Sequence, residues 1–187
     1  MIFRFPWISQ RARFFLLLGV VNIVVIVLAG FLLFGSKRES SVVQPSFSDE
    51  INRLKDRQQA TLMLQNSEGI TKSTLTVEIV RSPKSLETGL SNRAKLQSDG
   101  MLFILPERQV PRFWMKQMLF DLDMVWIDGD RISAITPDAK APADNTPLSD
   151  LPIYSPDEPV TLVLEVPAGN AEKLKLQIGD QLQFGSQ

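Results

Sequence analysis

The sequence predicts a mainly β fold: a compact, sandwich-like or barrel-like domain with two short helices, preceded by one transmembrane helix and a polar juxtamembrane segment. Three observations predict this class. Residues 14–34 form an uncharged apolar run, residues 75–184 hold short strand-like segments between turn signals, and only two short helices are expected among those segments. The expected parts are a cytoplasmic N-terminus (1–13), the transmembrane helix (14–34), a linker with a juxtamembrane helix and candidate first strand (35–72), and the β-domain (73–187).

The apolar run has the length of a membrane span. As a helix it would extend about 31 Å, which matches a hydrocarbon core of ~30 Å. The apolar part of a cleaved signal peptide is usually shorter, at ~7–15 residues, so we expect a retained anchor. More basic residues precede the run than follow it, which predicts a cytoplasmic N-terminus and a β-domain in the periplasm or outside the cell. These basic residues are Arg4, Arg11 and Arg13 before the run and Lys37 and Arg38 after it.

Local signals predict the elements that follow the anchor. Residues 35–45 form a polar linker, and Ser48 is placed to cap a short juxtamembrane helix. Residues 60–65 are the candidate first strand. From Leu75, apolar and polar residues alternate up to Val80, which is the period of a half-buried strand.

The rest of the β-domain follows the same signals. Ser82 and Pro83 have the chemistry of a helix start, and Gly89 can end that helix. The pair Asp128-Gly129 indicates a hairpin turn. The proline-rich segment 137–159 is expected to be a loop that is ordered only in part. Further strands are expected at 100–105, 112–117, 121–127, 131–135, 160–166 and 181–184, with a second helix at 171–175.

Composition excludes several classes of chemistry. The chain has no Cys and no His, so it has no zinc finger, iron–sulfur cluster, disulfide, cysteine nucleophile or histidine base. No EF-hand pattern is present either, and we expect no metal and no cofactor. Residues 1–38 hold five of the 20 basic residues and none of the 21 acidic ones, so residues 39–187 carry a net charge of −6. That charge disfavours a nucleic-acid partner.

A series of short motifs follows in a fixed order along the β-domain. The motifs are Thr88-Gly89-Leu90, Asp99-Gly100-Met101-Leu102-Phe103, Phe113-Trp114-Met115-Lys116, Leu122-Asp123-Met124, Leu164-Glu165-Val166, Pro167-Ala168-Gly169 and Ile178-Gly179-Asp180. The ordered series resembles the family known as domain of unknown function 192. The resemblance covers about 110 residues, roughly 75–184, and implies a compact β fold that is often secreted or membrane-tethered, with no established reaction. Ser91, Gln117, Met118 and Asp121 depart from the family pattern.

The strand at 112–117 offers a candidate ligand platform. Trp114 and Lys116 share one face, with Arg112 beside them, so an indole could stack on a ligand while the cations hold an anionic group. The alternative is that Trp114 packs under a loop and Lys116 pairs with an acidic residue. Large aromatic side chains usually contribute to packing, and both interpretations stay open.

Two carboxylates are further candidates. Asp123 shares an otherwise apolar face with Val125 and Ile127, so it either serves a structural role or belongs to a binding or catalytic site. As a structural residue it would cap a turn or pair with Lys116, if 112–117 and 121–127 form a hairpin. Glu165 lies opposite the apolar face of its strand and is expected in solvent, although the family resemblance singles it out.

These features predict a membrane-anchored, extracytoplasmic β-domain that binds a ligand or partner without catalysis. The candidate ligand-binding residues are Trp114, Lys116, Asp123, Glu165 and Arg112. The expected partners are the membrane, through residues 14–34, and an unknown small molecule or component of the cell envelope. The alternative is a hydrolase of envelope glycan that uses Asp123 and Glu165 as acid and base, which requires carboxylates ~5–10 Å apart. A structural spacer is a third hypothesis.

Overall fold

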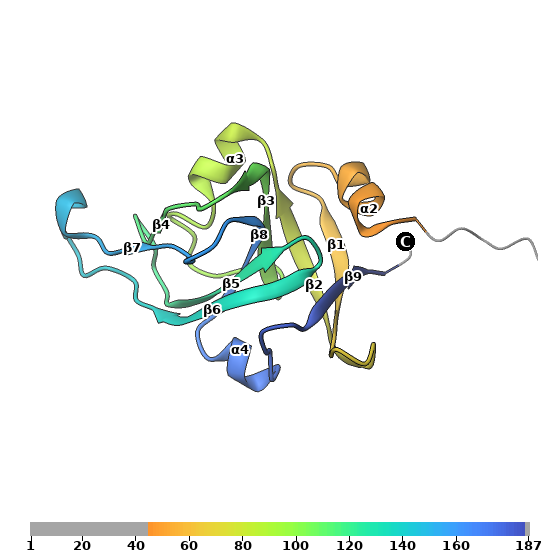
Figure 1. Cartoon of the computed structure of the whole chain (residues 1–187). Helices are drawn as coiled ribbons and strands as arrows, with labels where there is room; N and C mark the ends of the chain where they lie inside the picture. The colour runs from red at the N-terminus through yellow and green to blue at the C-terminus, as the bar shows by residue number, and fades with distance from the viewer. Residues whose placement is uncertain (1–44, 186–187) are drawn as a thin grey trace, which may run out of the picture. The chain divides into compact units, whose positions relative to one another are not determined.

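Seven strands close into a barrel in the computed structural model, which describes residues 45–185 (Figure 1). Their spatial order is β1-β2-β3-β8-β5-β6-β9, and each neighbouring pair is antiparallel except the parallel pair β2 and β3. The mainly β prediction is confirmed, and a closed barrel is its specific form. The strands are β1 (Gln59–Gln65), β2 (Thr71–Val80), β3 (Gly100–Gln109), β5 (Leu122–Asp128), β6 (Arg131–Ala139), β8 (Val160–Pro167) and β9 (Gln181–Phe184).

Short helices lie at the ends of the barrel strands, with α3 and α4 on opposite sides in Figure 1. The helices are α2 (Phe47–Arg53), α3 (Pro83–Thr88) and α4 (Asn170–Lys173), and a 3₁₀ turn, η1, spans Leu148–Asp150. Ser82 caps α3 and Gly89 ends it with φ of 47°, as the sequence predicts. The cap of α2 is Ser46 rather than Ser48, because Ser46 and Asp49 form a reciprocal capping box.

The compact unit begins at Pro45, upstream of the domain start expected at residue 73. The Phe47 ring of α2 stacks on Phe184 of β9, with ring centroids 5.4 Å apart. The predicted span 14–34 lies outside the described residues. Among residues 45–185, no helix is both long enough and apolar enough to cross a membrane.

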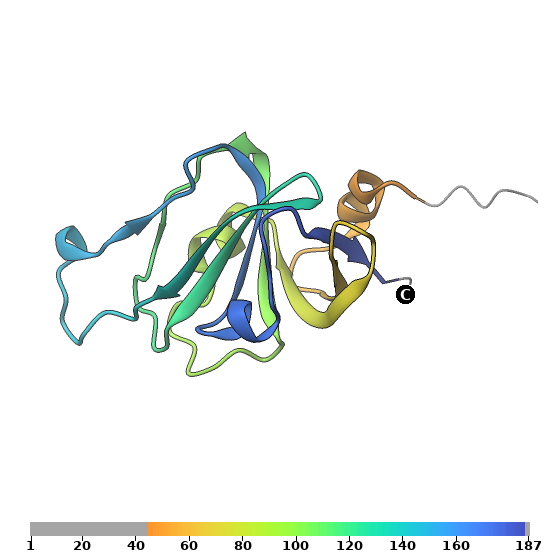
Figure 2. The same cartoon turned by 60° about the horizontal axis from the view of Figure 1, so that its bottom comes forward.

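A second, two-stranded sheet lies beside the barrel. It joins β4 (Phe113–Trp114) to β7 (Ile153–Tyr154), and both Figures 1 and 2 show this arm projecting from one side. The hairpin expected between 112–117 and 121–127 is therefore wrong. Both edges of β5 are already paired, with β6 on one side and β8 on the other, so β4 has no place there. The proline-rich segment 137–159 contributes the end of β6, η1 and β7, which gives it more regular structure than predicted.

Two hydrophobic cores lie on opposite sides of the central strands. The inner core fills the barrel and receives side chains from all seven of its strands, among them Leu162 and Leu164 of β8. The outer core covers the other face of β3, β5 and β8, where Val163 and Trp126 are fully buried. It is closed by side chains from α3, the segment after it and the two-stranded sheet. The outer face of β8 is therefore also removed from solvent.

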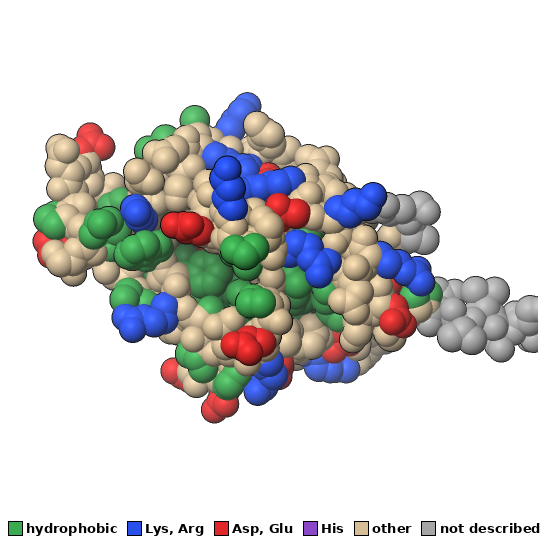
Figure 3. Space-filling model, turned by 90° about the horizontal axis from the view of Figure 1, so that it is seen from above, with side chains coloured by type: hydrophobic (Ala, Val, Ile, Leu, Met, Phe, Trp, Pro, Cys, Tyr) green, Lys and Arg blue, Asp and Glu red, His purple; other side chains and the backbone are tan. Residues whose placement is uncertain are grey.

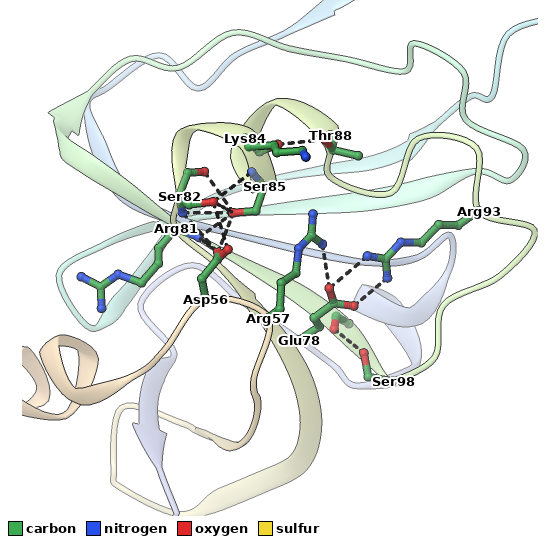
Figure 4. A network of polar contacts seen from close by, with 11 residues as sticks. Asp56, Arg57, Glu78, Arg81, Ser82, Lys84, Ser85, Thr88, Arg93 and Ser98 are labelled. Atoms are coloured by element: carbon green, nitrogen blue, oxygen red, sulfur yellow. Dashed lines mark hydrogen bonds and ion pairs between the residues drawn. The ribbon is translucent and has the colours of Figure 1, made fainter.

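A polar network anchors the start of α3 (Figure 4). Asp56 accepts hydrogen bonds from the backbone N–H groups of Arg81 and Ser82, at 2.8 and 3.1 Å, and from the Ser85 hydroxyl at 2.6 Å. Burial opposes the charged form of Asp56, but these hydrogen bonds outweigh it and hold the pKa of the carboxyl well below its usual range. These hydrogen bonds fix the first turn of α3 in place.

A further pair of contacts in the same region holds β2 to the segment that follows α3. Glu78 of β2 forms ion pairs with Arg93 at 2.6 Å and with Arg57 at 2.7 Å (Figure 4). The hydrogen bond from Arg93 is the largest cause that lowers the pKa of Glu78; partial burial opposes it, and the hydrogen bond from Arg57 lowers the pKa further. The segment between α3 and β3 is therefore tied to the barrel.

Candidate functional site

A pocket of about 300 Å³ opens between the C-terminal end of α3, the two-stranded sheet and the outer face of the barrel. Seen from above, this side of the molecule has a hollow with hydrophobic side chains in it and charged side chains around it (Figure 3). The volume of the pocket lies at the lower end of the range for small-molecule sites. The lining residues are Leu86, Glu87, Thr88, Gly89, Leu90, Ser91, Phe103, Leu105, Arg112, Phe113, Trp114, Met115, Met118 and Glu165.

Glu165 is the buried polar group of this pocket. It is 5 % exposed, between Met101 of β3 and Met124 of β5, which are its direct cross-strand partners. Burial raises the pKa of its carboxyl to about 8. The prediction that Glu165 faces solvent is wrong. It does lie opposite the inner apolar face, but the outer face of β8 is covered by a second core.

The Glu165 carboxyl has no protein partner among residues 45–185, where it takes part in no hydrogen bond and no ion pair. In the same part of the chain, no fully buried side-chain oxygen or nitrogen lacks a partner. The oxygens of Glu165 must therefore reach the open space of the pocket. A carboxyl group in this position is available to a ligand.

Gly100 sets the position of the Glu165 backbone. A Cβ atom at Gly100 would lie 2.9 Å from the Glu165 carbonyl oxygen and 3.1 Å from side-chain atoms of Leu164 and Val166. Only glycine lets β3 approach β8 this closely, and the pairing of Met101 with Glu165 follows directly from that approach.

Trp114 and Arg112, two residues of the predicted ligand platform, both line the pocket. Trp114 is 48 % exposed, which is unusual for so large an aromatic side chain. The Lys116 ammonium lies 5.4 Å from the centroid of its ring, within the range of a cation–π contact. Lys116 thus interacts with the Trp114 ring. Arg112 has neither a hydrogen bond nor an ion pair to any side chain among the described residues.

Asp123 serves the fold and does not line the pocket. One carboxylate oxygen accepts a hydrogen bond from the Asp138 N–H at 2.9 Å, and the other accepts from the Ala171 N–H at 2.8 Å. The predicted ion pair with Lys116 is therefore wrong. The reason is the pairing of β4 with β7, which removes Lys116 from the neighbourhood of β5.

The two carboxylates of the hydrolase hypothesis lie on opposite faces of the sheet. Asp123 pairs with Val166, whose side chain is in the inner core, whereas Glu165 pairs with Met124 in the outer core. Directly paired residues share a face and successive residues alternate. Asp123 and Glu165 therefore cannot act together as acid and base.

Most of the pocket wall consists of residues that the sequence does not mark as ligand-binding. These are Leu86 to Ser91, Phe113, Met115 and Met118. One signal was present: Ser91 and Met118, two of the positions that depart from the family pattern, both line the pocket. Within residues 45–185, no three acidic side chains lie close enough together to hold a metal ion.

Comparisons with known proteins agree with this fold. Residues 64–184 match the model of domain of unknown function 192 (DUF192), a family described as uncharacterised. The chain is 31% identical to a protein from Sinorhizobium meliloti described as a candidate transcription regulator. That match covers 70% of this chain and 97% of the other, with a TM-score of 0.59.

A second solved structure shows likeness of fold alone. It is a protein of unknown function from Novosphingobium aromaticivorans, 24% identical, with 67% of this chain and 85% of that chain covered and a TM-score of 0.55. Among curated proteins, none matches the chain.

Proposed function

The chain belongs to the uncharacterised DUF192 family, and we propose that its β-domain is a non-catalytic module that binds a small, largely apolar ligand in the pocket beside α3. The observation that carries the proposal is Glu165, a buried carboxyl without a protein partner that opens into this pocket. A buried polar group costs stability unless something hydrogen-bonds it, and a ligand would do so.

The other walls support the same function. Three aromatic rings, Phe103, Phe113 and Trp114, provide apolar area for a ligand body, and the exposed indole lies at the outer side. Most of the lining side chains are apolar, and the polar ones that could orient a ligand are Glu87, Thr88, Ser91, Arg112 and Glu165. The Sinorhizobium meliloti protein carries the description of a regulator of transcription, but for this chain we propose no nucleic-acid partner, because residues 39–187 have a net charge of −6.

A fragment screen on the full chain tests this function through its methionines. Met115 and Met118 line the pocket, whereas Met63 lies on β1 away from it, so ¹³C-methyl spectra separate pocket binding from binding elsewhere. We expect ligands that shift the Met115 and Met118 signals and leave Met63 unchanged. Trp114→Ala should weaken their binding about tenfold, because a stacking wall worth about 1–2 kcal/mol is lost.

The matched control is Glu172→Gln, a substitution of an exposed residue of α4 outside the pocket, which should bind as the wild type does. If no fragment in the library shifts the Met115 and Met118 signals, the proposed function is contradicted. The same holds if ligands bind the Trp114→Ala variant as tightly as the wild type.

We further propose that residues 14–34 anchor the protein in the membrane and that the β-domain lies in the periplasm or outside the cell. The uncharged run and the basic residues before it support this arrangement. A ligand there would be a small molecule or a component of the cell envelope.

Protease accessibility checks the proposed topology. Protease added to spheroplasts should degrade the β-domain, because the excess of basic residues before the run keeps the N-terminus inside. Cleavage of a periplasmic marker and protection of a cytoplasmic one are the controls. A β-domain that stays intact while the periplasmic marker is cut would contradict the orientation.

A further inference from the structure

The pocket contains an acidic group without a counter-charge. Glu165 meets no basic side chain among residues 45–185, and its cross-strand neighbours, Met101 and Met124, are uncharged. A ligand could interact with the free carboxyl either through a neutral hydrogen-bond donor or through a positive charge. The other residues that line the pocket indicate which of these two ligand types it favours.

The side chains around Glu165 favour a positive charge. The faces of aromatic rings carry partial negative charge, and Phe103, Phe113 and Trp114 all line the pocket. Met115 and Met118 add polarizable thioethers and no competing donor. A ligand cation in the pocket would therefore lie near aromatic rings and thioether sulfur atoms as well as the carboxyl.

The C-terminal end of α3 also favours a positively charged ligand. Leu86, Glu87 and Thr88 belong to its last turn and line the pocket. Among the described residues no donor reaches the carbonyl oxygens of Leu86 and Glu87, which are unpaired groups of a helix C-terminus. The exposed side chain of Glu87 adds a full negative charge at the rim.

Two basic side chains lie near the pocket, and neither forms an ion pair with Glu165. Arg112 is the basic residue of the lining and is exposed, and Lys116 lies over the Trp114 ring rather than in the pocket. The charged groups around Glu165 are therefore Glu87 from α3 and Arg112 from the segment before β4, while β3 and β5 contribute methionines.

We propose that this pocket binds an organic amine, whose ammonium group pairs with Glu165 while its hydrocarbon part packs against the aromatic and methionine side chains. The inference rests on the proposed function and names its ligand class. The ion pair forms only with the ionised carboxyl. Because burial raises the pKa of Glu165 to about 8, each amine that binds at lower pH releases one proton from Glu165 to the buffer.

Calorimetric titration of the full chain with three matched probes tests the inference. Phenethylamine, 2-phenylethanol and 3-phenylpropionate share one hydrocarbon body and end in an ammonium, a hydroxyl and a carboxylate. At pH 8 we expect the amine to bind about tenfold tighter than the alcohol, and the carboxylate to bind weakest. Between about pH 6 and 8 the affinity for the amine should rise about tenfold per pH unit.

Titrations in buffers of different ionisation enthalpy should show about one proton released per amine at pH 6.5. Glu165→Gln should abolish proton release and lower amine affinity about tenfold, with alcohol affinity unchanged, while Glu172→Gln should behave as the wild type. Amine binding without proton release, an alcohol or carboxylate that binds as tightly, or no binding of the amine would overturn the inference. If the alcohol alone binds and shifts the Met115 and Met118 signals, the proposed pocket function stands and only the amine class fails.

Discussion

Replacing Glu165 with glutamine should remove much of the pH dependence of folding stability between about pH 5 and 8. In the folded protein burial raises the pKa of this carboxyl to about 8, whereas its ordinary value is 4.5. Between these two values the folded state holds a proton that the unfolded state has lost. Wild-type stability therefore falls as pH rises through this window, by up to about 1.4 kcal/mol per pH unit, and is constant above it.

The Glu165→Gln variant cannot ionise, so the difference in unfolding free energy between variant and wild type isolates this residue. We expect the variant to be more stable than the wild type at pH 8 by a few kcal/mol and to have nearly the same stability near pH 5. Urea unfolding at several pH values measures the difference. Glu172→Gln, exposed on α4, should follow the wild-type curve. Parallel curves for Glu165→Gln and wild type would contradict the burial of the carboxyl.

Asp123→Ala should destabilise the domain by roughly 3–5 kcal/mol. The carboxylate accepts hydrogen bonds from two backbone N–H groups, those of Asp138 and Ala171, and is itself 1 % exposed. Hydrogen bonds to a charged group contribute about 1.5–3 kcal/mol each, and removing the acceptor leaves the buried amide of Ala171 and the partly buried amide of Asp138 unpaired. Because these amides belong to β6 and the start of α4, their loss should loosen both elements.

Denaturant unfolding at pH 7 measures this effect. Asp123→Asn keeps one acceptor oxygen and should lose less stability than Asp123→Ala, while Asp144→Ala, at an exposed position, should stay within about 0.5 kcal/mol of wild type. A stable Asp123→Ala variant with reduced ligand binding would mean that Asp123 belongs to a binding site and would contradict the structural role.

The sequence by itself determined the local elements of this protein. The alternation from Leu75 to Val80 and the strand at 160–166 follow from a period of two residues, which the chain carries locally. The helix between Ser82 and Gly89 follows from capping chemistry at its two ends. The absence of His and Cys likewise fixes which side-chain chemistry is available.

Only the tertiary structure decided what covers each strand face. Alternation showed that Glu165 lies opposite the inner apolar residues, but not that α3 and the two-stranded sheet bury that opposite face as well. The same holds for Asp123, whose partners Asp138 and Ala171 lie 15 and 48 residues away along the chain. The physical reason is that a strand's local pattern fixes which residues share a face, whereas burial and pairing depend on distant segments that fold against it.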